Sequence, residues 1–271
     1  MSATTVSGAI HERRTPGWAV VAGQELRDLW IRGRGLPLTL AFSILLGVIA
    51  YLTATNQALN FLEQREAVSL TLQVAIAVGS LLALLASADA ISGERERRTL
   101  ESLLLTPVSR SNLAIGKLLA ALSLWAAAFV TTIPYVWYLG RGVGLVGVSL
   151  AAGFVVGTLV AITLASLGLL ISTFSKTNWL SLSISLFLLL ALFAPTQLPS
   201  NAERGWLGDF LLRANLVTAA ERYVGWLLVQ GHGWNEDIGW LLAPFVGAVV
   251  GLAAVGFIGG RYITLRTGGR S

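Results

Sequence analysis

The sequence contains no cysteine, and only 12% of its 271 residues are charged. Without cysteine the chain cannot form disulfides, thiolate metal sites or a cysteine nucleophile. It also lacks the G-x-x-x-x-G-K-S/T pattern of a phosphate-binding loop, so any ATP hydrolysis must come from another chain. Its two histidines, His11 and His232, lie outside the apolar stretches, which argues against a metal site or a catalytic base inside a membrane.

Apolar residues dominate what is present. They make up 55% of the chain, and the mean hydropathy is +0.72. A soluble domain cannot bury that much apolar surface, whereas a chain whose solvent is lipid need not. A helix needs about 20 apolar residues to cross a bilayer, and the sequence offers six long charge-free stretches. We expect six transmembrane helices, at roughly 36–55, 68–90, 113–138, 146–174, 179–198 and 238–260.

The basic residues predict the orientation of these spans. The net charge is +5, which could suggest a nucleic-acid partner, but the basic residues sit between apolar spans and therefore indicate membrane orientation. With the N-terminus inside, fourteen of the nineteen Lys and Arg residues fall on the cytoplasmic side and five fall outside. An even number of spans then places both termini in the cytoplasm. No nucleic-acid partner is expected.

An amphipathic segment precedes the first span. Residues 17–32 place apolar side chains on one helical face and charged ones on the other, which is typical of a helix lying in the membrane interface. The side chains that define this predicted interfacial helix are Trp18, Val21, Leu26, Arg27, Asp28 and Leu29.

A second segment lies between spans five and six, outside the membrane in this topology. Its part from Gly208 to Gln230 is helical in tendency but too polar for a seventh span. We expect a re-entrant or surface-lying helical segment, ended by the turn Gly231-His232-Gly233.

The connection between spans two and three carries the most information. Ser92 and Gly93 can start a short helix whose first turn holds acidic residues, and Pro107 ends it. Leu100, Leu103 and Leu104 form an apolar stripe at i, i+3 and i+4. Arg97 and Glu101 form an i,i+4 pair on the other side, and a new helix begins at Ser109 or Ser111. Such a helix can lie on the membrane or seat in a groove of a soluble partner.

The sequence GERERRTLESLLLTPVSRSNLAIGK from Gly93 to Lys117 closely resembles the signature of ABC-2 type permeases, the membrane subunits of a class of ATP-binding-cassette exporters. The only mild departure is Arg98, where the family often has glycine. The resemblance implies that Glu94–Leu105 is a coupling helix that binds a separate ATPase subunit. The residues implied to make this contact are Glu94, Arg95, Glu96, Arg97, Arg98, Thr99, Leu100, Glu101, Leu103, Leu104 and Pro107.

The resemblance also sets the expected fold and partners. It implies an all-α integral membrane protein in a bacterial or archaeal plasma membrane, with residues 1–35 as the N-terminal segment, 36–260 as the six-helix domain and 261–271 as a basic cytoplasmic tail. Its partners would be an ABC ATPase subunit, a second permease copy or related permease chain, and lipid. The chain itself would hold no cofactor, and ATP and Mg would bind the partner ATPase. Export is the direction that the resemblance implies, along a pathway between two copies near spans two and five.

Two other functions compete with this one. An ion-coupled secondary transporter would favour carboxylates buried in the spans, and the only acidic residue close to a span is Asp89. A membrane anchor for an ATPase, without ATP coupling, is the other alternative.

Overall fold

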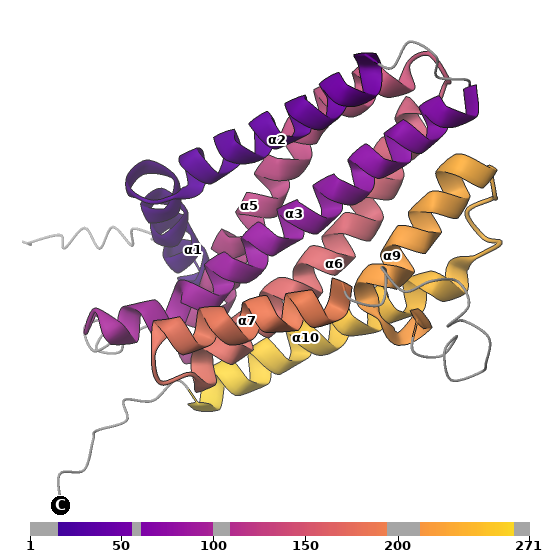
Figure 1. The fold of residues 1–271 in the computed structure, drawn as a ribbon. Coiled ribbons are helices and arrows are strands. Elements are labelled where there is room, and N and C mark those ends of the chain that lie inside the picture. Colours follow the sequence, from indigo (N-terminus) through magenta and orange to yellow (C-terminus); the bar gives the residue numbers. More distant parts are fainter. Residues whose placement is uncertain (1–15, 56–60, 100–108, 194–211, 263–271) are drawn as a thin grey trace, which may run out of the picture.

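The computed structural model describes residues 16–55, 61–99, 109–193 and 212–262, and these residues form helices and no strand (Figure 1). The long helices are α2 (Gly35–Thr55), α3 (Phe61–Glu96), α5 (Arg110–Gly140), α6 (Val146–Phe174), α7 (Asn178–Phe193) and α10 (Leu242–Tyr262). The shorter ones are α1 (Gly17–Arg27), η1 (Asp28–Arg32), α9 (Leu216–Gly225), η4 (Trp226–Gln230) and η5 (Ile238–Leu241).

Five of these helices are long and apolar enough to cross a membrane: α2, α3, α5, α6 and α10 together with η5. The bounds of α6, Val146–Phe174, are those that the sequence predicted. The sixth predicted span is α7, which is apolar but has only 16 described residues. Its predicted end at residue 198 lies outside the described residues, so the count of six spans stays a prediction.

The core of the bundle is where α3, α5 and α6 meet, and close packing there depends on glycine. Trp125 on α5 is only 4% exposed and lies between α3 and α6. A Cβ atom on Gly157 would come within 2.3 Å of the Trp125 ring, and one on Gly79 within 2.8 Å. The indole nitrogen of Trp125 donates to the hydroxyl of Thr158 at 3.2 Å. Glycine therefore makes room for the largest side chain of the core.

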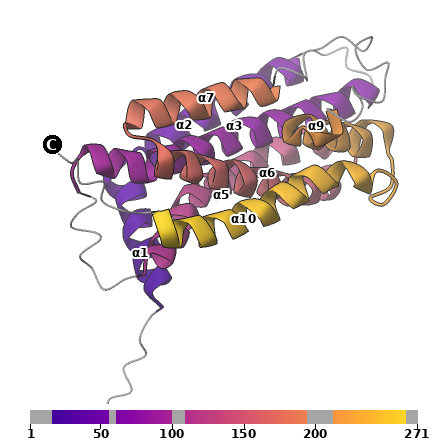
Figure 2. The same ribbon diagram turned by 90° about the horizontal axis from the view of Figure 1, so that it is seen from below.

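The outer helices cover this core on different sides. α7 packs on α3 and α6, whereas α10 packs on α6 and α5, so the two run along opposite sides of the bundle (Figure 2). Beyond α7, the segment between spans five and six contains α9 and η4, as predicted, and Gly231 ends it in the left-handed conformation with φ 74°. The beginning of this predicted segment, residues 208–211, lies outside the described residues.

The N-terminal helix α1 packs against the first turns of α5. Val21 and Ala22 are buried, and a Cβ atom on Gly116 would meet the Val21 side chain at 2.6 Å. Two of the residues expected to face lipid or water thus face protein, and Trp18 remains 42% exposed. The helix itself is confirmed, while its position in a membrane interface stays a prediction.

One expectation is wrong. The short helix predicted to start at Ser92 and Gly93 does not start there, because α3 continues without a break from Phe61 to Glu96. Ser92 and Gly93 are buried inside this helix, and the Ser92 hydroxyl donates to the Ala88 carbonyl one turn earlier. Glu94 and Glu96 therefore lie in the last turn of a long helix rather than in the first turn of a short one.

Candidate functional site at the basic end of the bundle

The candidate site lies at the end of the bundle where α3 finishes and α5 begins. We call this the basic end, because Arg95, Arg97, Arg110 and Lys117 gather there. α1, the connection between α6 and α7 and the end of α10 lie at the same end (Figure 1). The described parts of the chain thus begin and finish at one end of the molecule, as an even number of crossings requires.

A buried lysine joins three helices at the basic end. The side chain of Lys117 on α5 is only 1% exposed, and its ammonium group lies 2.6 Å from Glu25 on α1 and 2.5 Å from Glu94 on α3. Both carboxylates are partly shielded from water, with side-chain exposures of 26% and 18%. One cation between two carboxylates leaves an excess negative charge. The second oxygen of Glu94 is buried and has no hydrogen-bond partner in the described part of the chain.

Two further side chains tie the end of α3 to the connection between α6 and α7. The guanidinium of Arg95 donates to the carbonyl oxygens of Thr173 and Ser175, where α6 leaves its last carbonyls without helical partners. A carboxylate oxygen of Glu96 accepts from the backbone N–H of Asn178 at 3.2 Å, at the start of α7. The final turn of α3 therefore contacts α5, α6 and α7 through charged side chains, and Lys117 connects it to α1.

The turn after α3 shows why glycine is the residue expected at position 98 in the resembled pattern. The N–H of Thr99 donates to the carbonyl of Glu94, and that of Arg98 donates to Arg95, the two bonds that close a helix with a left-handed residue. Arg98 has φ 59°, a conformation that costs a residue with a Cβ atom about 1–2 kcal/mol and that glycine adopts freely. A glycine at this position would suit the backbone better than arginine.

We expect Arg98→Gly to stabilise the folded chain by about 0.5–1 kcal/mol, because relief of strain exceeds the extra entropy of glycine in the unfolded state. The apparent Tm in detergent should rise by roughly 2–4 °C for each kcal/mol gained. Arg98→Val is the matched control, and its Tm should fall because a β-branched residue fits this conformation poorly. Equal Tm values for the two variants would contradict the strained turn.

The structure places only part of the predicted ATPase-binding set. Glu94, Arg95 and Glu96 make the contacts described above, and Thr99 follows the turn. Arg97 lies 3.6 Å from Asp89 on α3, and its predicted pair with Glu101 stays a prediction. The remaining members of the set lie outside the described residues: Leu100, Glu101, Leu103, Leu104 and Pro107.

Sequence reasoning missed Glu25 and the role of Lys117. Glu25 lies in the amphipathic segment but is not among the residues that define its faces, and Lys117 enters the sequence analysis only as the last residue of the family signature. A lysine seven residues into the charge-poor helix α5 is nevertheless a signal, because a buried ammonium group needs an anionic partner. That helix starts at the first of the two predicted positions, where the Ser109 hydroxyl caps it by accepting from the N–H of Asn112.

A groove of about 770 Å³ opens beside the buried lysine. Its walls come from α1 and η1, the start of α2, the second half of α3, α5 and α7. Glu94 and Lys117 lie at one end of it, whereas Leu82 and Leu186 lie toward the other. The groove thus runs from a charged end into the apolar part of the bundle.

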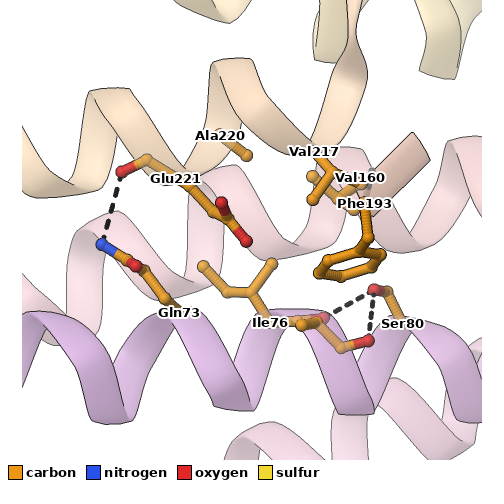
Figure 3. A pocket seen from close by; sticks show the side chains of 9 residues that line it. Gln73, Ile76, Ser80, Val160, Phe193, Val217, Ala220 and Glu221 are labelled. Atoms are coloured by element: carbon orange, nitrogen blue, oxygen red, sulfur yellow. Dashed lines mark hydrogen bonds between the residues drawn. The ribbon is translucent and has the colours of Figure 1, made fainter. Parts of the chain in front are cut away.

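A smaller pocket lies at the opposite end, between α3, α6, α7 and α9. In Figure 3 the carboxylate of Glu221 on α9 points toward Ile76 and Phe193, which line the pocket with mostly apolar neighbours. Gln73 donates to the backbone carbonyl of Glu221 at 3.4 Å, but the Glu221 carboxylate itself has no ion-pair or hydrogen-bond partner among the described residues. Burial raises the pKa of this carboxyl from 4.5 to about 6.

This shift predicts a pH dependence of stability. Between pH 4.5 and about 6 the folded state keeps a proton on Glu221 that the unfolded chain has released, so stability falls as pH rises through this window. Glu221→Gln keeps the neutral form and should raise the apparent Tm at pH 7.5 by roughly 2–4 °C, the effect of about 1 kcal/mol in a chain of this size. At pH 4.5 the same substitution should change the apparent Tm little. Glu66→Gln, at an exposed position on α3, is the control, and a shift of equal size at both pH values would refute this account.

Comparison with known proteins identifies the family. The family model of the ABC-2 family transporter protein matches residues 19–204, which cover most of α1, all the contacts of the final turn of α3, and the spans as far as α7. Comparison with curated proteins found no match. The matched region is well over half of the chain, and it contains the buried lysine, both of its carboxylate partners and the turn at Arg98. The chain therefore belongs to the ABC-2 family of transporter proteins, whose members are membrane subunits of ABC transporters without an ATPase site of their own.

Proposed function

We propose that this chain is the permease subunit that couples ATP hydrolysis by a separate ATPase to export across the membrane. The segment between α3 and α5 would contact the ATPase through the stripe of Leu100, Leu103 and Leu104. ATP and Mg would be bound by that partner. Two copies of the chain, or this chain with a related permease, would enclose the pathway.

The observation that supports this proposal is the set of contacts made by the final turn of α3. The proposed ATPase-binding segment follows that turn directly. Glu94 accepts a hydrogen bond from Lys117 of α5, which also donates to Glu25 of α1. Arg95 donates to a carbonyl at the end of α6, and Glu96 accepts from the backbone at the start of α7. A displacement applied to the segment would therefore reach four other helices without crossing a flexible connection. Coupled movement of the spans requires such a junction.

The proposed topology places the basic end in the cytoplasm of a bacterium or archaeon. Fourteen of the nineteen basic residues would then lie on that side, as the positive-inside rule favours. The soluble ATPase is also on that side, where ATP is available. Activity reporters fused after α10 and within the segment between α7 and α9 should report opposite sides of the membrane.

The decisive experiment is co-purification of the partner. The tagged chain is expressed in its native host with its neighbouring genes, extracted in mild detergent, and its associated proteins are identified. We expect a P-loop ATPase to co-purify with the wild type. The Leu104→Glu variant should not retain the ATPase, because burying an unpaired carboxylate at the contact costs more free energy than the contact returns.

Leu104→Met is the matched control, since it keeps the position apolar and should retain the ATPase. Elution of all three proteins at the same volume in size-exclusion chromatography shows that the membrane part is folded. If a well-folded wild type brings down no ATPase, or if Leu104→Glu retains it fully, the proposed coupling contact is wrong.

A further inference from the structure

The groove at the basic end has the size and shape of a binding site for an amphiphile. Its volume of about 770 Å³ lies within the range of about 300–1,000 Å³ that is usual for small-molecule sites. Along α3 it extends from Leu82 to Glu94, which at about 1.5 Å per residue is roughly 18 Å. α2 and α7 both pack on α3 and run along opposite sides of it in Figure 1. With α5, they give the groove apolar walls from four spans.

The charged end of the groove carries an excess of carboxylates. Four acidic and three basic side chains line it. Lys117 is shared between Glu25 and Glu94, and Arg97 lies beside Asp89, which leaves one carboxylate without a matching cation. Asp28 and Arg34 line the same wall, so the seven charged side chains of the groove sum to one negative charge. In a site bounded by apolar walls, an uncompensated negative charge attracts a cation and repels an anion.

Two further features favour a positively charged ligand. The second oxygen of Glu94 is buried without a hydrogen-bond partner in the described part of the chain, so its lone pairs remain to interact with a cation. Trp179 at the start of α7 lines the same groove and is 76% exposed, which leaves its ring face accessible to a cation. The apolar walls beyond, from Leu82, Leu85 and Leu186, suit a hydrocarbon or aromatic body.

We infer that this groove binds hydrophobic cations and, resting on the proposed function, that such molecules are the class this permease exports. The positive centre lies near Glu94 and Asp28, and the apolar body extends along α3 between α2 and α7. A cation whose charge is spread over a large apolar body suits the groove best, because it loses less hydration on entering than a compact ammonium group does.

Tetraphenylphosphonium and tetraphenylborate test this inference, because they share size and shape and differ in the sign of the charge. Equilibrium dialysis against the full chain in nanodiscs, without ATPase or ATP, measures the binding of each, and empty nanodiscs give the partition into lipid. We expect saturable binding of the phosphonium above the lipid background, at least about tenfold tighter than that of the borate, a difference of about 1.4 kcal/mol.

Variants at the groove wall separate charge from shape. Ser183 on α7 is partly buried in this wall, and Ser183→Lys adds a positive charge there, whereas Ser183→Met adds a side chain of similar length without charge. The phosphonium should bind the lysine variant at least about fivefold more weakly than the methionine variant. Asp28→Asn, at an exposed position, should also weaken it by a similar factor.

Equal binding of the two probes, or equal affinities of the two Ser183 variants, would overturn the assignment of hydrophobic cations. That result is distinguishable from failure of the proposed function, since association with the ATPase is measured separately through Leu104. Loss of phosphonium selectivity while the ATPase still co-purifies refutes the ligand class only. If the wild type binds the phosphonium but no ATPase co-purifies with it, the ligand class of the groove stands and the coupling role is refuted.

Discussion

Replacing Lys117 by methionine is expected to destabilise the folded chain by about 3–5 kcal/mol, the usual cost of removing one partner from a buried ion pair. The variant leaves Glu25 and Glu94 close together without their shared cation, and both carboxylates are mostly shielded from water. The apparent Tm in detergent should fall by roughly 6–20 °C, at about 2–4 °C per kcal/mol. Thermal unfolding followed by size-exclusion chromatography measures it.

Two controls make this result specific to the ion pair. Lys176→Met changes the only other lysine, which is exposed between α6 and α7, and should leave the Tm nearly unchanged. The triple variant Lys117→Met, Glu25→Gln, Glu94→Gln removes all three charges and should recover much of the loss. If Lys117→Met has the same apparent Tm as the wild type, the ion pair does not contribute to the packing of α1 and α3 on α5.

The second large effect is expected at the centre of the bundle. Trp125→Ala should cost about 3–5 kcal/mol, because it leaves a cavity where the indole ring fills the space above Gly79 and Gly157. Trp137→Ala is the matched control on the same helix, since that ring is 53% exposed. Its Tm should change by no more than a few degrees. Comparable losses for the two variants would contradict the assignment of Trp125 to the core.

The same contact offers a compensation test. Gly157→Val alone should destabilise by about 1–3 kcal/mol, because its side chain collides with the Trp125 ring. Combined with Trp125→Ala, the valine should fill part of the cavity, so the double variant should be more stable than the sum of the two single effects predicts. Strict additivity would indicate that α6 moves away from α5 rather than packing against the ring.

Local patterns predicted the elements of this fold well. The structure confirms the bounds of the helix from 146 to 174 and the turn at Gly231, and it starts the next helix after Pro107 at Ser109, one of two predicted positions. All three depend on nearby residues. The same local reasoning failed at the end of α3, where a charged stretch follows the span. Ser92 and Gly93 resemble a helix start, but α3 continues through them because its neighbours hydrogen-bond to it there: the Ser172 hydroxyl accepts from the N–H groups of Ile91 and Ser92.

The site itself could be predicted only in part. The family signature pointed to a set from Glu94 to Pro107, of which the structure describes residues 94–99, but the partners of Glu94 and Lys117 are distant in sequence. Lys117 is separated from Glu25 by 92 positions and from Glu94 by 23, and no short-range pattern connects them. Tertiary packing decided both contacts of Lys117. Arg97 lies 3.6 Å from Asp89 of α3, and its predicted partner Glu101 lies outside the described residues.

The unbroken length of α3 has a mechanical consequence. Its 36 residues span about 54 Å, well over the roughly 30 Å of a bilayer core, and no proline interrupts it. Glu94 near one extremity touches the buried lysine, while Gln73 and Ile76, about 30 Å away, border the pocket beneath α9. The Trp125 ring packs on Gly79, which lies between Ile76 and Ser80 of that pocket. A rigid tilt of α3 about this contact would therefore displace the groove end, about 22 Å away at Glu94, far more than the pocket beneath α9.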